Sequence, residues 1–438
     1  MVKLAETPPT THPPDHLRAA TDAVTGGNKA PGLAHRLRAH LKQLFLEFPW
    51  KIIFHDWTGA SYEVGVGELH WYGKPLVVTI KTPAAARMFL SYNGLGILEK
   101  FVQGEVDMND NLFVLSDIKK HGRFELSLFQ KLLHRFRHKM FQNISRATVN
   151  VKSHYDLPQE VFNIYLDKTY LSYSSAIFEN PFEIKREELI REGVGKTDTF
   201  DSLEKAQWRK FKDAVDFVKP AEGETLLDVG CGYSGQLQVA LENYPFKKVV
   251  GWTLSRNQVE LGRQSLAGFD PDSWELNEGD YRQDDRVFDH ITSTGMISHV
   301  GPRGLVPYVR NVRDRIKSGG RYVHHSLMTN YSKGRFDFEA GVAFNKKYVW
   351  PGFHWFTIGE HVKALEENGF RIEKLVNISP HYTKTIAAWY ERMMNNETLM
   401  REFMDERTFR AWQIYLAGAS GSLGNGNMFV YRIYCVAI

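Results

Sequence analysis

The most chemically informative part of the chain is an acidic residue two positions ahead of a glycine cluster. Residues 225–229 are mostly apolar and include Asp228, and Gly230, Gly232 and Gly235 follow them. An apolar strand that breaks into glycines and continues as a helical pattern is typical of the start of a βαβ unit. The glycines let the backbone approach a ligand, and the acid would attract an ammonium or hydroxyl groups but repel a pyrophosphate. The turn therefore predicts a site for S-adenosylmethionine, which carries both groups.

The glycine turn alone is weak evidence, because a generic βα turn with a solvated aspartate has the same residues. Later segments of the chain add to it. Thr253 and Gln258 belong to a Thr-Leu-Ser-Arg-Asn-Gln segment after the next strand-like run, and Asp280 lies in Gly-Asp-Tyr-Arg. Taken by themselves, Thr253 and Gln258 are better explained as a helix N-cap and a solvated helix position. The surrounding motifs favour a cofactor site instead.

Several ordered motifs together resemble a known family. Residues 225–235, 249–258 and 288–293 resemble the class I S-adenosylmethionine methyltransferases. Upstream, the stretches His-Tyr-Asp-Leu at residues 154–157 and Tyr-Leu-Ser-Tyr-Ser-Ser-Ala at residues 170–176 are similar to the cyclopropane-fatty-acid synthase family. This family includes bacterial cyclopropane-fatty-acyl-phospholipid synthases and their mycolic-acid relatives. The resemblance covers roughly residues 90–415, and the order of the motifs makes it specific.

The resemblance implies a set of cofactor-binding residues. They are Tyr173, Ser174, Asp228, Gly230, Gly232, Thr253, Gln258 and Asp280. By the same resemblance, the acid and the glycines hold the methionine part of S-adenosylmethionine, and the Thr-Gln pair lies on its ribose side. The second acid lies near the adenine, and the Tyr-Ser pair closes over the cofactor. A threonine at the end of the second strand departs from most class I methyltransferases, which have an acid there, but it fits this family.

The resemblance also implies a reaction. In the family, the π electrons of an acyl-chain alkene attack the sulfonium methyl group, and the resulting carbocation loses a proton to bicarbonate as a cyclopropane ring closes. A cysteine, a glutamate, a histidine, a tyrosine and a backbone amide hold the bicarbonate. Such a cation needs an apolar slot that excludes water and a base that is already in position.

Two of the residues implied in bicarbonate binding are replaced in this chain. Ser175 stands where the family has the cysteine, and Ser298 stands where it has the glutamate. His325 and Tyr382 match the family, so these four residues are the predicted catalytic set. A serine can form hydrogen bonds but is shorter than glutamate and neutral. Two interpretations remain open: the serines and a water preserve the anion site, or the enzyme makes a different product.

Three functions are compatible with this pattern. The first is C-methylation or cyclopropanation of unsaturated acyl chains of membrane phospholipids. The second is a divergent enzyme that makes a methyl-branched, methylene or furan-type fatty acid without ring closure. The third is a non-catalytic lipid-binding relative, which the intact cofactor motifs argue against. Bicarbonate is an open question, while S-adenosylmethionine is expected.

The expected fold class is α/β. Strand and helix patterns alternate between residues 226 and 327, which predicts a doubly wound, Rossmann-like sheet of the class I methyltransferase type. A smaller α+β domain associated with lipid is expected ahead of it, with short strands in residues 52–80, including 69–71. The predicted divisions are a flexible leader at 1–32, the lipid-associated domain at 33–142 and the catalytic domain at 143–438. The alternating tail, residues 428–436, is expected to form an edge hairpin.

The composition and charge of the chain limit which kinds of partner it is expected to bind. The net charge of +4 is too small to indicate nucleic-acid binding, and no metal site is expected. Two cysteines, Cys231 and Cys435, give no basis for a disulfide framework, and no apolar run has the length of a bilayer span. Residues 131–152 are basic, free of acids and interleaved with apolar positions, which fits an anionic membrane surface or equally an ordinary solvated helix face. We expect a cytoplasmic protein at the membrane periphery, and a homodimer remains open.

Overall fold

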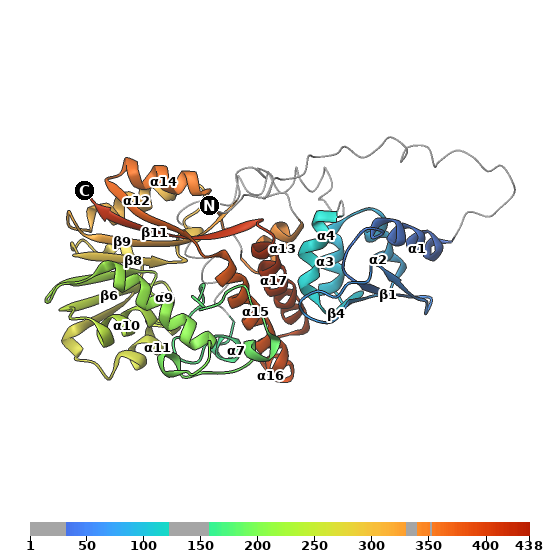
Figure 1. Cartoon of the computed structure of the whole chain (residues 1–438), viewed down its shortest axis with the longest axis horizontal. Helices are drawn as coiled ribbons and strands as arrows, with labels where there is room; N and C mark the ends of the chain where they lie inside the picture. Colours follow the sequence, from blue (N-terminus) through green and yellow to red (C-terminus); the bar gives the residue numbers. More distant parts are fainter. Residues whose placement is uncertain (1–31, 122–156, 330–339, 351–352) are drawn as a thin grey trace.

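Two β-sheets, one in each half of the chain, organise the fold (Figure 1). A computed structural model of the chain describes residues 32–121, 157–329, 340–350 and 353–438. The leader at 1–31, the basic stretch at 131–152 and the junction near residue 143 lie outside the described residues. The domain divisions therefore stay a prediction. Among the described helices, none combines the length and the apolar character needed to cross a membrane.

The smaller sheet has four strands in the order β2-β1-β3-β4. Its strands are β1 (Ile52–Asp56), β2 (Ser61–Val64), β3 (Leu76–Ile80) and β4 (Val106–Asp110). Buried and half-buried positions alternate along β1 and β3, so one face of this sheet is a core face. The helices of this half are α1 (Leu33–Leu44), α2 (Pro83–Leu90), α3 (Gly94–Val102) and α4 (Leu115–His121). The expected strand at residues 69–71 is wrong: this segment is irregular, and Leu69 and Trp71 are exposed.

The larger sheet has seven strands in the order β10-β11-β9-β8-β5-β6-β7. Its strands are β5 (Thr225–Val229), β6 (Lys248–Thr253), β7 (Trp274–Glu278), β8 (His290–Thr294), β9 (Arg321–Thr329), β10 (Phe370–Asn377) and β11 (Met428–Ala437). Strands β5 to β9 pair in parallel. The chain runs outward from β5 in one direction to β7 and then returns to β8 on the other side. Ligands of open α/β sheets bind at this reversal, beyond the carboxyl ends of the strands.

Helices cover both faces of the larger sheet, as Figure 1 shows. One face packs against α9 (Leu203–Val218), α10 (Gly235–Asn243) and α11 (Arg256–Leu266). The other packs against α12 (Leu305–Asp314) and α14 (Ile358–Glu367). The doubly wound α/β sheet expected from the sequence is confirmed.

The C-terminal strand is not at the sheet edge, so this part of the prediction is wrong. Strand β11 lies between β10 and β9 and pairs antiparallel with both. A helical insertion after β10 carries the chain away from the sheet, and β11 returns into the gap beside β9. This insertion consists of α15 (Ser379–Asn395), α16 (Glu397–Phe403) and α17 (Glu406–Gly424). The edge strand is β10.

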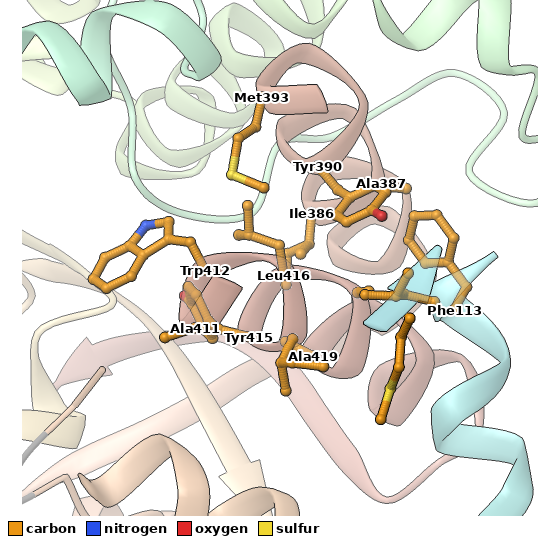
Figure 2. Close-up of a cluster of buried hydrophobic side chains, with 14 of the residues drawn as sticks. Phe113, Ile386, Ala387, Tyr390, Met393, Ala411, Trp412, Tyr415, Leu416 and Ala419 are labelled. Atoms are coloured by element: carbon orange, nitrogen blue, oxygen red, sulfur yellow. The ribbon is translucent and has the colours of Figure 1, made fainter. Parts of the chain in front are cut away.

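The inserted helices join the two halves of the molecule. Figure 2 shows Phe113 beside the buried side chains of α15 and α17, and its ring centroid lies 4.9 Å from that of Tyr390. Helix α13 (Ala340–Tyr348) contacts the same half, because Lys347 pairs with Glu99 at 2.6 Å. One hydrophobic core thus runs from the small sheet through these helices.

Short elements complete the described chain. They are the helices α7 (Gln159–Tyr165) and α8 (Arg186–Leu189), and the 3₁₀ turns η2 (Leu112–Val114), η3 (Gly195–Thr197), η4 (Pro271–Ser273), η5 (Tyr281–Gln283) and η6 (Ile297–His299).

Candidate active site

A cavity of about 300 Å³ lies where the carboxyl ends of β5, β6, β8 and β9 meet. All twelve residues predicted from the sequence line this cavity. They are Tyr173, Ser174, Ser175, Asp228, Gly230, Gly232, Thr253, Gln258, Asp280, Ser298, His325 and Tyr382. Residues far apart in the chain therefore come together at one place, while the role of each residue stays a prediction.

The glycine turn needs glycine for different reasons at different positions. Gly230 and Gly232 have φ values of +79° and +55°, a region that favours glycine. A Cβ at Gly230 would lie 2.9 Å from Met296, whereas one at Gly232 would meet no protein atom within 4 Å. At Gly235 a Cβ would lie 2.6 Å from Phe211, so this glycine lets α10 pack closely on α9. Of the three, Gly232 leaves open space for a ligand.

Asp228 is a buried carboxyl in the middle of the sheet. Its side chain is 3% exposed, and Thr292 donates a hydrogen bond to it at 2.8 Å. Burial raises the pKa of Asp228 to about 7, although the hydrogen bond from Thr292 and the charge of Lys210 act to lower it. A ligand ammonium or hydroxyl at this position would favour the ionised form.

The polar pair after β6 is not the simple helix start that it resembles in isolation. Ser255 caps α11, accepting a hydrogen bond from the backbone of Gln258. Thr253 is buried and donates to the side chain of Gln258, which is also buried, at 2.6 Å. The alternative of an N-cap and a solvated position is therefore wrong. Asp280 begins the η5 turn and also accepts from the side chain of Arg282 at the cavity wall.

The segment with Tyr173 and Ser174 is held by buried polar residues that the sequence reading missed. Asp167 accepts from two backbone N–H groups of this segment, those of Tyr170 at 2.6 Å and Ser172 at 2.7 Å. Lys210 on α9 donates to the hydroxyl of Ser174 at 2.8 Å and to that of Ser172. One feature of the sequence could have indicated Lys210: it falls in the helical repeat of buried apolar residues of α9.

The hydroxyls of Ser175 and Ser298 each lie within hydrogen-bond distance of a nearby backbone carbonyl. The hydroxyl of Ser175 donates to the carbonyl of Ala176 at 3.1 Å. That of Ser298 donates to the carbonyl of Gly295 at 3.3 Å. Each side chain is short and buried, so each offers the cavity an acceptor oxygen.

His325 and Tyr382 both line the cavity. The Nδ1 atom of His325 is buried and has no hydrogen-bond partner among the described residues. Burial, followed by the positive charges of Arg432 and Lys210, holds the pKa of His325 well below its usual range. This ring is therefore neutral. The ring of Tyr382, on α15, stands edge-on to Trp389 at 5.9 Å.

Aromatic rings form the remaining wall, and of those named here the sequence reading selected only Tyr173. Tyr173 stacks on Trp350 with centroids 5.8 Å apart, and the centroid of the His299 ring lies 5.3 Å from that of Trp350. Phe353, Trp355 and Tyr415 also line the cavity. Trp350, Phe353 and Trp355 lie within six residues of one another in the sequence, whereas Tyr173 and Tyr415 come from distant parts of the chain, so no single motif indicates the whole wall. These rings give the cavity an apolar end beside its polar, glycine-lined end.

The polar end fits S-adenosylmethionine. Gly232 leaves room for close approach, Asp228 provides a carboxyl for the amine, and Thr253, Gln258 and Asp280 provide polar groups along the same edge. The sheet order and this glycine turn define a class I S-adenosylmethionine-dependent methyltransferase.

The family follows from comparison with known sequences. The family model for mycolic acid cyclopropane synthetase matches residues 142–433, more than half of the chain. The protein belongs to this family, which confirms the resemblance seen in its motifs.

Several relatives with assigned names are similar to the chain. A probable fatty acid methyltransferase of Pseudomonas putida is 29% identical over 65% of this chain and 68% of its own. A sphingolipid C9-methyltransferase of Gibberella zeae is 29% identical over 77% of this chain, which spans only 64% of that relative's length. The cyclopropane-fatty-acyl-phospholipid synthase of Escherichia coli is 26% identical over 82% of this chain and 87% of its own.

Solved structures show the same fold. A mycolic acid cyclopropane synthase in complex with SAH and CTAB is 26% identical, with a TM-score of 0.59 over 66% of this chain and 98% of its own. The cyclopropane synthase MmaA2 from Mycobacterium tuberculosis is 23% identical, with a TM-score of 0.58 over the same shares.

Proposed function

We propose that this enzyme transfers a methyl group to an alkene carbon of an unsaturated lipid acyl chain and releases an open-chain product. S-adenosylmethionine supplies the electrophilic methyl group when it is bound. The relatives named as acting on lipids include a probable fatty acid methyltransferase, a sphingolipid C9-methyltransferase and a cyclopropane-fatty-acyl-phospholipid synthase, so lipid modification is common to all. The residues of the cavity favour methylation without ring closure.

The apolar end of the cavity supports an acyl chain as the substrate. Trp350, Phe353, Trp355 and Tyr415 line it, and an acyl alkene has only apolar surface to offer them. The aromatic faces also suit the positive charge that develops on the chain, since ring faces attract cations. The same walls exclude water, which would otherwise trap that cation.

The proposal depends mainly on the hydrogen bonding and the neutral charge of Ser175 and Ser298. Bicarbonate has a hydroxyl that needs an acceptor and anionic oxygens that need donors. Each serine hydroxyl has a backbone carbonyl within hydrogen-bond distance, at 3.1 Å for Ser175 and 3.3 Å for Ser298, so each already has a partner inside the protein for its single hydrogen. The carboxylate that the family places at residue 298 is absent. The serine oxygens are acceptors, but they are neutral and shorter than a glutamate carboxylate, so the residues present fit bicarbonate poorly and the proposed reaction has no step through it.

The proposed reaction is balanced without ring closure. The alkene π electrons form the new carbon–carbon bond to the methyl group, and S-adenosylhomocysteine leaves. The adjacent chain carbon becomes a cation. Loss of a chain proton returns the electron pair of that C–H bond to a new double bond, which gives a methyl-branched unsaturated chain. The net release is one proton.

The test restores the two replaced residues. The wild type should methylate vesicles of unsaturated phospholipid at a rate independent of added bicarbonate, without cyclopropane product. The double variant Ser175→Cys with Ser298→Glu should gain cyclopropane product that depends on bicarbonate. Gas chromatography with mass detection separates the products.

A matched control tests whether a new thiol at a buried serine changes the product by itself. Ser326 is buried like Ser175, donates its hydroxyl to the next carbonyl at 3.0 Å, and does not line the cavity. Ser326→Cys should leave the product unchanged. Cyclopropane lipid made by the wild type in a bicarbonate-dependent reaction would contradict the proposal, and unmodified lipid in every case would show that the protein is not an acyl-chain methyltransferase.

A further inference from the structure

A histidine ring to which the proposed function has so far given no role forms part of the aromatic wall of the cavity. His299 ends the η6 turn, directly after β8, and its side chain borders the cavity. In the part of the chain that the structure describes, the contact recorded for this ring is with Trp350, at 5.3 Å between centroids and an interplanar angle of 44°. A neutral nitrogen base therefore lies beside the apolar end, where the acyl chain is placed by the proposed function.

We propose that His299 is the group that accepts the proton lost from the methylated acyl chain. The inference rests on the proposed function and names the base that it requires. A ring nitrogen of His299 forms the new N–H bond, the C–H electron pair becomes the chain double bond, and the imidazolium then returns its proton to water. No oxidant, metal or added anion takes part in this step.

The charges around the two cavity histidines favour His299 over His325. Arg432 and Lys210 both act on His325, and their positive charges oppose a second cation there. Burial alone lowers the pKa of His299 to about 4, so its ring is neutral at physiological pH and free to accept a proton. A weak base is sufficient, because a proton beside a carbocation is a far stronger acid than an imidazolium.

Trp350 favours the charged form that His299 would pass through. An imidazolium next to an indole is stabilised by the ring quadrupole, and tryptophan is the best partner among the aromatic side chains. Trp350 is itself fixed by stacking on Tyr173, with an interplanar angle of 19°. The tyrosine thus positions the tryptophan, and the tryptophan supports the histidine.

The backbone holds His299 in place from both directions. Its own N–H donates to the carbonyl of Met296 at 3.1 Å. The carbonyl of the preceding residue, Ser298, accepts from the backbone N–H of His354 at 2.9 Å. A base contributes to catalysis only when it is held within reach of its proton, and this turn provides that constraint.

The test separates methyl transfer from proton removal. For His299→Ala and His299→Gln, we would measure S-adenosylhomocysteine formed and methylated alkene formed with unsaturated phospholipid vesicles. Both variants should still bind S-adenosylmethionine in a calorimetric titration, which also shows that they are folded. The methylated alkene should fall relative to S-adenosylhomocysteine, by up to the order of 10²–10⁴ that a positioned base contributes, as water-trapped hydroxy product rises. Added imidazole should restore alkene in His299→Ala, a result that a structural role would not give.

The failures are distinguishable. An unchanged ratio of alkene to S-adenosylhomocysteine in both folded variants would overturn the assignment of His299 while leaving the proposed function intact. The same holds if His325→Ala, and not His299→Ala, shifts the products from alkene to alcohol. Cyclopropane as the main wild-type product would instead contradict the proposed function itself.

Discussion

Replacing Gly232 by alanine should weaken cofactor binding at a predictable cost in stability. The residue has φ = +55°, where a Cβ costs about 1–2 kcal/mol. No protein atom lies within 4 Å of the added carbon, so no further clash is expected within the fold. The carbon instead occupies space beside the cavity, where the cofactor must approach the backbone. Affinity for S-adenosylmethionine should fall at least about tenfold, which is about 1.4 kcal/mol.

Gly223 supplies a matched control. It has φ = +84°, its added Cβ would also meet nothing within 4 Å, and it does not line the cavity. Gly223→Ala should lose the same about 1–2 kcal/mol of unfolding free energy and keep its affinity. Urea titration measures the first quantity and calorimetric titration the second. Wild-type affinity in Gly232→Ala, or equal losses of affinity in the two variants, would refute the placement of the cofactor at this turn.

Three further outcomes are expected. The pKa of Asp228 is about 7, and a cationic ligand favours its ionised form, so the affinity of the wild type for S-adenosylmethionine should rise from pH 6 to about pH 8. The variant Asp228→Asn should bind weakly and should not show that rise. A parallel pH dependence of affinity in both proteins would argue against a contact between Asp228 and the cofactor. Arg392 forms a fully buried pair with Glu204 at 2.7 Å, so Arg392→Ala should lose about 3–5 kcal/mol of unfolding free energy, whereas Arg256→Ala, at an exposed pair, should unfold at the same urea concentration as the wild type. If the basic stretch docks on anionic lipid, vesicle sedimentation should show binding that weakens with salt and falls on the triple change Arg135→Glu, Arg137→Glu and Lys139→Glu; binding insensitive to both would favour domain packing.

The sequence reading located the polar end of the site because local rules govern it. A strand, a glycine turn and a helix follow one another within a few residues around Asp228, and each has a characteristic pattern. The replacements at Ser175 and Ser298 could be recognised from the sequence because they interrupt motifs that otherwise match the family. The hydrogen bonds of these serines to neighbouring carbonyls could not be recognised, since these depend on side-chain rotation in the folded state.

The rest depended on contacts between distant segments. Lys210 reaches the segment around Ser174 from another helix, and nothing in the sequence indicates that pairing. The aromatic wall combines Trp350 with rings from the other side of the cavity, so it exists only after folding. The prediction that β11 lies at the sheet edge was wrong for a related reason. An alternating pattern identifies a strand but does not specify its neighbours in the sheet.

Labelling the transferred methyl group tests the central claim most directly. The protein would be incubated with S-adenosylmethionine that has a fully deuterated methyl group and with vesicles of unsaturated phospholipid. The acyl chains would then be released from the lipid and separated, and their masses would be measured by mass spectrometry. Proton loss from the chain predicts a methyl-branched unsaturated acid that retains the complete CD₃ group. A cyclopropane acid that has lost one deuterium from the transferred carbon would contradict the account.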